Sequence, residues 1–348
     1  MHKKILLISD ALCAPFDEGF KNIVFSLCKQ LESKNVLIVT DAQNKTNKLK
    51  VTRVSFNKLF LNKKLKLLLK TYSPDVILYV PYASYTFGSF FRGKILKLMS
   101  RNSRVLILGI QHRGLSIIEK ILIENFLRPD LLLLLKKPHQ GFFNEEELKI
   151  KILLPAVDRI KFCQATKKEK EEIRAEYHMP SNKKVVLHVG HIISSRNIES
   201  LVEIQRIHDM QVVIVGSSST NSDSNLKEKL KKEGVIVMDN YIADISKIYK
   251  MADIYVFPVF NDTAAIDMPL SVLEAMACNL PIITTRFGGL VDLFKEDPAF
   301  MYFNTTEELI EKIKNMDNFE NHNNRRKIEP FTWDRFADEI IAACEELA

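Results

Sequence analysis

Short apolar runs alternate with amphipathic segments along most of this sequence, and this rhythm limits the folds that it can adopt. Short runs rich in Val, Ile and Leu between helical segments of about 10–15 residues indicate βα units and parallel sheets covered on both faces. The strands that we expect are Ile5–Ile8, Val36–Val39, Val76–Val80, Val105–Leu108, Leu131–Leu135, Val185–Val189, Val212–Val215, Val235–Val237, Ile254–Phe257 and Ile282–Ile283. The helical segments between them include Ile23–Leu31, Lys58–Lys70, Ile198–Ile207, Leu226–Lys232 and Leu270–Ala277.

The rhythm restarts near residue 184, which indicates two doubly wound domains in series. A charged helix at Lys167–Tyr177 and a break at Pro180-Ser181 precede the restart. A chain of 348 residues is long enough for two domains with separate cores. We therefore expect the domain boundary between residues 155 and 180.

Composition predicts a cytoplasmic protein. No apolar run approaches the ~20 residues of a membrane span or the roughly 7–15 of a secretory signal. The five cysteines are scattered and form no C-x-x-C pair, which suits a reducing compartment and argues against disulfides or a zinc site. They are Cys13, Cys28, Cys163, Cys278 and Cys344.

Charge is divided unevenly between the two halves. Residues 1–178 hold 32 Lys and Arg against 17 Asp and Glu, a net charge of +15, whereas residues 179–348 hold 18 against 26, a net charge of −8. This indicates an anionic partner for the first half, a phospholipid surface or a nucleic acid, with an ordinary lysine-rich surface as the alternative. Two segments, Ser89–Arg101 and Lys58–Lys70, have the character of basic amphipathic helices. They predict peripheral contact with an anionic membrane, unless their apolar stripes pack on the sheet.

The segment Ala265–Thr285 (AIDMPLSVLEAMACNLPIITT) carries the strongest chemical signal. Pro269 suits the first turn of a helix, and Asp267 lies where a carboxylate could cap the helix amides. Such a helix N-terminus favours phosphate, because its unpaired N–H groups and its dipole attract anions.

The run LEAMACNLPIITT, followed by Gly288-Gly289, resembles the signature of the family 4 retaining glycosyltransferases. The resemblance implies the GT-B fold, in which two Rossmann-like domains face a cleft, and a nucleoside diphosphate sugar as donor, with no metal or other cofactor. Glu274 matches the second glutamate of the family pattern, which binds the ribose hydroxyls. The first glutamate is replaced by Ile266 and a glycine by Pro269. Asp267 or Asp262 could substitute for the lost carboxylate, or Asp267 could be a helix cap alone.

A second segment, Val186–Glu199, resembles the family's diphosphate clamp. The family has Gly-Arg after a strand and a Lys near the next helix. Here Gly190 keeps the glycine, His191 takes the Arg position and Arg196 takes the Lys position. A guanidinium can pair with phosphate through two hydrogen bonds. Leu270 and Ser271, at the start of the following signature helix, would add backbone amides to the same site.

Three further matches extend the resemblance over the second half of the chain. They are Leu153–Phe162, Ile245–Pro258 and Phe331–Trp333. The last precedes, in the family, a helix that packs back on the first domain. We therefore expect an acceptor-binding domain of residues 1–160 and 334–348, and a donor-binding domain of residues 161–333.

The first half contributes two site candidates. Gly19 stands where the family often has a glycine-rich turn near the donor phosphates, although a helix-entry glycine is equally consistent. His112 follows the strand Val105–Leu108, where family members place a histidine near the acceptor, and a surface histidine is the alternative.

The predicted function is transfer of a hexose, with retention, from a nucleotide sugar to a lipid-linked or glycan acceptor. Retention follows from the resemblance, and His112 and Asp267 are the candidate catalytic residues. The rivals are a GT-B sugar-nucleotide epimerase and a non-catalytic GT-B partner protein, which Ile266 and His191 favour. No nucleic-acid module is recognisable. The expected location is the cytoplasm, at the inner face of the membrane if the basic half binds lipid.

Overall fold

The structure is a computed structural model that describes residues 3–16, 18–43, 48–82, 84–100, 102–138, 142–144, 147–218, 222–316 and 323–347. Its internal contacts divide the chain into two compact units. The first unit comprises Met1–Pro155, Ile266–Met268 and Trp333–Ala348, and the second comprises Ala156–Ala265 and Pro269–Thr332. Arg101, part of the basic segment predicted at Ser89–Arg101, lies outside the described residues.

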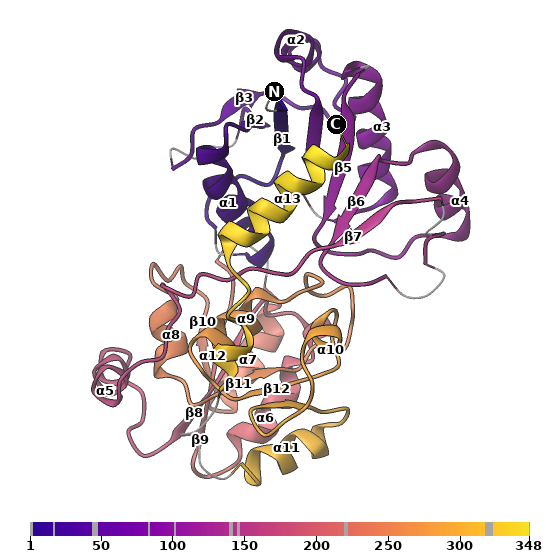
Figure 1. The fold of residues 1–348 in the computed structure, drawn as a ribbon. Helices are drawn as coiled ribbons and strands as arrows, with labels where there is room; N and C mark the ends of the chain where they lie inside the picture. Colours follow the sequence, from indigo (N-terminus) through magenta and orange to yellow (C-terminus); the bar gives the residue numbers. More distant parts are fainter. Residues whose placement is uncertain are drawn as a thin grey trace. The chain divides into compact units, whose positions relative to one another are not determined.

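The first unit is built on a parallel sheet whose described strands follow the order β3-β2-β1-β4-β5-β6-β7 (Figure 1). The strands are β1 (Ile5–Ser9), β2 (Leu37–Asp41), β3 (Thr52–Val54), β4 (Val76–Val80), β5 (Arg104–Gly109), β6 (Leu131–Leu134) and β7 (Ile150–Ile152). The strand order reverses between β1 and β4, and every pairing is parallel. Such a reversal opens a crevice at the carboxyl ends of the strands, where ligands bind in α/β folds.

Helices cover both faces of this sheet. They are α1 (Gly19–Leu31), α2 (Lys63–Tyr72), α3 (Phe87–Ser100), α4 (Ile117–Phe126) and α13 (Trp333–Leu347). Helices α2, α3 and α4 share one buried cluster with the strands, whereas α1 packs against α13. Ile8, Tyr79 and Ile107 belong to that cluster and are fully buried. The C-terminal helix thus belongs to the first unit.

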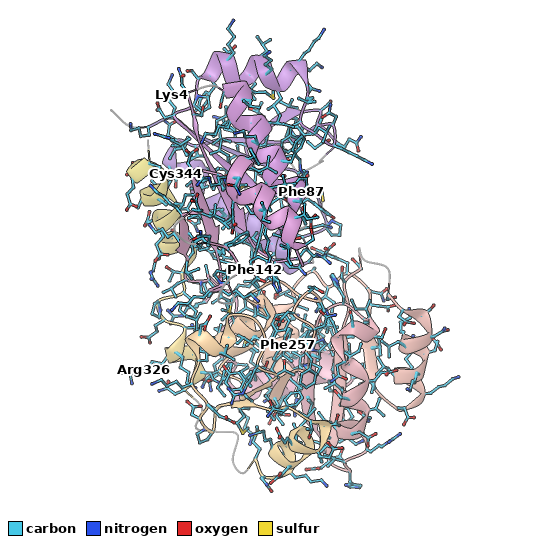
Figure 2. The ribbon with its side chains drawn as sticks, turned by 90° about the vertical axis from the view of Figure 1, so that its right-hand side faces the viewer. Lys4, Phe87, Phe142, Phe257, Arg326 and Cys344 are labelled. Carbon is cyan, nitrogen blue, oxygen red and sulfur yellow. The ribbon has the colours of Figure 1, made fainter. Side chains whose placement is uncertain are left out.

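The second unit repeats the design with the strand order β10-β9-β8-β11-β12-β13 among its described residues. The strands are β8 (Lys184–Val189), β9 (Met210–Val215), β10 (Ile236–Met238), β11 (Ile254–Phe257), β12 (Ile282–Thr284) and β13 (Phe300–Tyr302). The helices are α5 (Lys167–Glu176), α6 (Leu201–Gln205), α7 (Ser224–Lys232), α8 (Ser246–Met251), α9 (Leu270–Ala277), α10 (Leu290–Leu293), α11 (Thr306–Lys314) and α12 (Asn324–Lys327). Phe257 lies in the packed interior and Arg326 at the surface (Figure 2).

The predicted pair of Rossmann-like parallel domains is confirmed. Three further strands, β3, β7 and β13, were not predicted; each is three residues long and lies at an edge of its sheet. The helix predicted over Lys58–Lys70 begins instead at Lys63, because the Asn62 side chain accepts hydrogen bonds from the amides of Lys64 and Leu65. Phe60, just before it, has a left-handed backbone (φ 59°).

Gly109, at the end of β5, has a packing role that can be tested. A Cβ atom there would lie 2.3 Å from Tyr85 Cδ1 and 2.8 Å from Leu134 Cδ2. We expect Gly109→Ala to lower the free energy of unfolding by about 1–3 kcal/mol, because the neighbours must move. Gly114→Ala is the matched control, since nothing lies within 4 Å of its added Cβ. Equal urea midpoints for the two variants would contradict this packing.

Candidate functional site

The predicted site residues form one group in each unit. Gly190, His191, Arg196, Leu270, Ser271 and Glu274 belong to the second unit. Gly19, His112 and Asp267 belong to the first, because Ile266–Met268 is counted with it.

Arg196 is a buried cation. It ends the short 3-10 helix Ser194–Arg196, its Nε donates to the Ala264 carbonyl at 3.1 Å, and only 8% of the residue is exposed. No carboxylate among the described residues forms an ion pair with it. Burial lowers the pKa of its guanidinium to about 10. Since a buried charge without a counter-ion is costly, the site favours an anion that would pair with Arg196.

Gly190 lets this guanidinium lie against the backbone that follows β8. A Cβ atom at Gly190 would be 2.1 Å from Arg196 Nη1 and 3.1 Å from His188 Nε2. The close approach therefore needs a glycine at this position. His191, the next residue, is half-buried in the same loop. The structure thus brings Gly190 and Arg196 together, as the clamp motif suggested.

The sequence analysis missed His188, which is fully buried within β8. Its Nδ1 lies 3.0 Å from the Val256 carbonyl, to which an N–H must donate. The neutral ring then leaves Nε2 as an acceptor, and Nε2 has no partner among the described residues. Burial, together with the charge of Arg196, lowers the pKa of His188 to about 3. The ring therefore remains neutral and adds no charge beside Arg196.

Glu274 is buried on α9 and hydrogen-bonded to a tyrosine. Tyr249, on α8, donates its hydroxyl to Glu274 Oε2 at 2.7 Å, and Glu274 is only 8% exposed. Burial raises the pKa of Glu274 to about 6, against the lowering effects of Tyr249 and Lys161. The carboxyl is thus held within hydrogen-bonding reach of a rigid aromatic partner. Tyr249 carried no signal in the sequence, because it reads as an ordinary apolar position of its helix.

The N-terminus of α9 has amides without an intrahelical partner. No backbone carbonyl of the described chain accepts from the amides of Leu270 or Ser271, whereas Val272 and Leu273 bond to the Pro269 carbonyl. The Ser271 side chain reaches Tyr255 of β11. Burial raises the pKa of Tyr255, and its side-chain hydrogen bond with Ser271 opposes that rise. The helix start therefore presents donors of the type that bind phosphate.

Asp267 does not cap this helix, so that part of the prediction is wrong. The N-cap is Pro269, which has no side-chain cap, and Asp267 instead accepts from the backbone amide of His112 at 3.1 Å. Its Oδ1 also lies 2.8 Å from His112 Nδ1 and 4.0 Å from Lys136 Nζ. The reason is tertiary: the amide of Asp267 donates to the Ile110 carbonyl, which holds the residue against the first unit's sheet.

Three neighbouring strands bring partners to Asp267. Tyr85, His112 and Lys136 follow β4, β5 and β6, so they converge at one edge of the sheet. All three are buried, and Asp267 is 1% exposed with no hydrogen-bond partner for Oδ2 among the described residues. Because a carboxylate only accepts, the hydrogen of this bond is assigned to Nδ1 of His112, which leaves Nε2 as the ring nitrogen available to a ligand. Burial and then the nearby Asp267 carboxyl raise the pKa of Tyr85.

Gly19 begins α1 and packs against Ile266. A Cβ atom at Gly19 would lie 3.2 Å from Ile266 Cδ1. Ile266 stands at the position of the family's first glutamate, so an apolar contact occupies this place. The contact explains why a glycine suits position 19, and its donor role stays a prediction.

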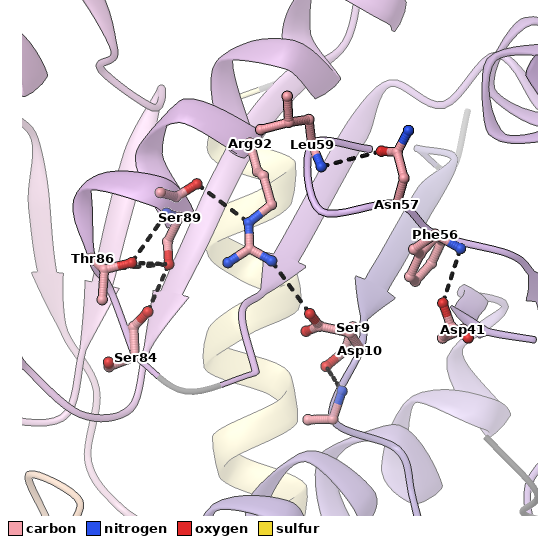
Figure 3. Close-up of polar contacts among 12 residues, drawn as sticks. Ser9, Asp10, Asp41, Phe56, Asn57, Leu59, Ser84, Thr86, Ser89 and Arg92 are labelled. Carbon is pink, nitrogen blue, oxygen red and sulfur yellow. Dashed lines mark hydrogen bonds and ion pairs between the residues drawn. The ribbon is translucent and has the colours of Figure 1, made fainter. Parts of the chain in front are cut away.

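A further polar pair at the strand reversal was also missed. Asp10 follows β1, and Arg92 of α3 donates from Nη1 to Asp10 Oδ2 at 3.4 Å (Figure 3). Burial raises the pKa of Asp10, although Arg92 acts to lower it. The Arg92 guanidinium also lies 5.5 Å from the Phe60 ring and 5.8 Å from the Tyr79 ring. The position of Asp10 directly after a predicted strand was the available signal.

Comparison with known proteins supports a family for this chain. Residues 169–330 match the model of the family Glycosyl transferases group 1. This part of the chain is therefore similar to Glycosyl transferases group 1. The narrower assignment to family 4 stays a prediction.

Curated relatives align with part of the chain. An uncharacterized glycosyltransferase of Methanocaldococcus jannaschii is 25% identical over 224 residues, 60% of this chain and 56% of the relative. The capsular polysaccharide biosynthesis glycosyltransferase CapM of Staphylococcus aureus is 23% identical over 189 residues, 50% of this chain and 48% of the relative. The chain thus spans about half the length of these relatives.

Solved structures match the fold over the whole chain. A Rickettsia africae glycosyltransferase superposes with a TM-score of 0.81 at 16% identity and covers 100% of this chain and 99% of its own. Anabaena HepE, solved in complex with UDP-glucose, gives a TM-score of 0.75 at 15% identity, covering 99% of this chain and 100% of its own. The GT-B fold is therefore shown. No helix in the described part of the chain is both long and apolar enough to cross a membrane.

The pKa of Glu274 makes a prediction for stability. Burial raises this pKa from 4.5 to about 6. The contribution of Glu274 to the free energy of unfolding is therefore greatest below pH 4.5, and it falls by about 2 kcal/mol as the pH rises through 6. Glu274→Gln keeps an acceptor for Tyr249 and removes the buried charge. We expect it to raise the melting temperature at pH 8 but not at pH 4. Glu345→Gln, exposed on α13, is the control and should have no such pH dependence.

The buried cluster around Asp267 makes a second prediction. Asp267→Ala leaves Lys136 buried without its carboxylate, so the free energy of unfolding should fall by about 2–4 kcal/mol. The matched control is Asp262→Ala, at the half-buried aspartate that was the other candidate substitute. Chemical denaturation of both variants tests this, and a smaller loss for Asp267→Ala than for Asp262→Ala would refute the arrangement.

Proposed function

We propose that this protein transfers a hexose, with retention, from a nucleoside diphosphate sugar to a lipid-linked or glycan acceptor. In this reaction the bond between the anomeric carbon and the diphosphate oxygen breaks, and a bond to an acceptor hydroxyl oxygen forms. The hydroxyl proton passes to the departing diphosphate. The leaving group therefore gains negative charge, and stabilising that charge is the main task of the site.

Arg196 carries this proposal. It is a buried guanidinium without a carboxylate partner among the described residues. Its Nη1 lies close to Gly190, and it belongs to the same unit as the N-terminus of α9. A diphosphate would supply the missing counter-charge and would accept from the amides of Leu270 and Ser271. His191 would donate one further hydrogen bond from the same loop. No metal is required by this arrangement.

Glu274 would hold the ribose. A carboxylate accepts from two vicinal hydroxyls at once, and Tyr249 holds its Oε2 in place. Anabaena HepE has been solved in complex with UDP and with UDP-glucose, which supports a uridine-type donor for our proposal. The relatives in capsular polysaccharide synthesis support a glycan or lipid-linked acceptor.

His112 and Asp267 would act on the acceptor side. Asp267 orients the His112 ring by accepting from Nδ1, so Nε2 is available to accept from a sugar or acceptor hydroxyl. The Asp10–Arg92 pair, at the strand reversal of the first unit, offers both a carboxylate and a guanidinium to a hydroxylated acceptor. In this proposal the first unit therefore binds the acceptor.

A panel of nucleoside diphosphate sugars tests the proposal by thermal shift and by turnover. At least one UDP-sugar should raise the melting temperature, and its affinity should fall when the pH drops below about 6, because Glu274 then loses its charge. Arg196→Ala and Glu274→Ala should each weaken binding roughly 10- to 100-fold. Arg206→Ala, an exposed arginine of the same unit, is the control.

Three outcomes separate the rival functions. Donor binding with sugar transfer to an added acceptor supports the proposal. Binding without any turnover would favour a non-catalytic GT-B protein, and conversion of the donor sugar to its epimer without an acceptor would favour an epimerase. Unchanged donor affinity in both variants would place the donor elsewhere.

A further inference from the structure

Helix α4 of the first unit exposes apolar side chains to an unusual degree. Ile117, Ile118 and Phe126 are 77%, 71% and 63% exposed, and Ile121 and Leu122 are 52% and 37% exposed. Among the residues of this helix, only Ile123 is a buried apolar side chain. A surface helix normally places its apolar stripe toward the core.

The orientation of α4 is the reverse of that norm. At 100° per residue, the five exposed apolar side chains fill one half of the helix, and Asn125 is the only polar residue among them. The charged residues face the protein. Glu119 completes a capping box with Ser116, and Glu124 accepts from the amide of Asn144 at 2.7 Å. The outward half of α4 is therefore apolar and uncharged.

Exposed apolar side chains continue on the neighbouring helices. Helix α3 contacts both α2 and α4, and these three helices cover the same face of the sheet (Figure 1). The exposed apolar residues of the neighbouring helices are Leu67 on α2 and Phe91 and Leu98 on α3, and Leu59 and Leu61 are exposed in the segment that precedes α2. The second unit has four large exposed apolar residues in its described part, Ile160, Tyr241, Phe260 and Val291. The exposure is thus concentrated on one helical layer of the first unit.

The same layer carries most of the net positive charge of residues 1–178. Residues 58–128 contain 13 Lys and Arg against 3 Asp and Glu, so they supply +10 of the +15 in residues 1–178. The three acids are Asp75, Glu119 and Glu124, and each bonds to a backbone amide of the protein. Arg113 and Arg128 flank α4 at its two ends and are exposed, and Arg128 forms an ion pair with Glu147. Lys97 and Arg104 pair with Asp130, so the cations left to face a partner are chiefly the lysines of α2, Lys94 and Arg113. An apolar face bordered by cations suits a surface that combines hydrocarbon with negative charge.

We propose that α4 docks the protein on an anionic lipid bilayer, with Ile117, Ile118, Ile121, Leu122 and Phe126 entering the interface. The basic residues of the α2–α4 layer would contact the lipid headgroups. An acidic protein partner would complement the positive charge equally well. Its charged surface would not match the half of α4 that carries no charged groups. The bilayer meets both requirements at once.

This places the membrane contact on a helix that the sequence analysis did not identify. In the predicted segment Ser89–Arg101, Phe90, Ile95 and Leu96 pack in the core of the first unit. That segment therefore contributes cations such as Lys94, and α4 contributes the apolar face. The inference does not depend on the proposed sugar transfer, because lipid binding is measured without substrate.

Vesicle co-sedimentation tests the proposal with the full chain. Wild-type protein should bind vesicles that contain both phosphatidylcholine and phosphatidylglycerol. Binding should be weaker to vesicles of phosphatidylcholine alone, and weaker at high salt. Combined substitution of Ile117→Gln, Ile118→Gln and Ile121→Gln should weaken binding at least about tenfold. Arg113→Gln should weaken it about fivefold, and only when phosphatidylglycerol is present.

The matched control combines Tyr241→Gln, Phe260→Gln and Val291→Gln, which removes exposed apolar side chains of the second unit. It should bind vesicles like the wild type. Phe126→Gln is the fallback if the triple α4 variant does not fold, as judged by circular dichroism. Equal vesicle binding by folded α4 variants and wild type would overturn the proposal. The proposal would also be overturned if the wild type did not bind vesicles but formed a dimer, detected by light scattering, that the α4 variants lose.

Discussion

Parallel strands end at a common edge, and this geometric constraint assembles the candidate sites of both units. In the first unit the segments after β4, β5 and β6 supply Tyr85, His112 and Lys136 to one buried carboxylate, Asp267. In the second unit the loop after β8 supplies Gly190. Because both faces of a parallel sheet are covered by helices, the strand ends are the places where polar side chains can meet a ligand.

Both sites contain buried ionisable groups, which lower the stability of the protein when no ligand is bound. Arg196 and Glu274 both have pKa values shifted toward the neutral form by burial, to about 10 and about 6. A group that is costly to bury alone becomes favourable when a ligand pairs with it, so the sites are less stable empty than filled. Asp267 differs, because the chain itself provides His112 and Lys136 as its partners. Only its Oδ2 is left without a hydrogen-bond partner among the described residues.

Helix α4 of the first unit has its apolar half on the outer surface. Its amphipathic pattern is ordinary in sequence, and the side that faces the sheet is decided by the strands on either side. Ile123 belongs to the buried cluster of the first unit and Glu124 accepts from the Asn144 amide, so this side of α4 faces the protein. The apolar half is then left outside, where a bilayer can cover it. The basic balance of residues 58–128 gives that surface its preference for negative charge.

By itself the sequence determined the two Rossmann-like sheets, because they depend on the local alternation of apolar runs and helical segments. The helix α9 has the bounds that the periodicity predicts. Only the tertiary structure decided that Asp267 pairs with His112 rather than capping α9, that Tyr249 holds Glu274, and that α4 faces outward. These contacts join residues far apart in sequence, 155 positions in the case of His112 and Asp267, and no local pattern reports which distant side chains a fold will bring together.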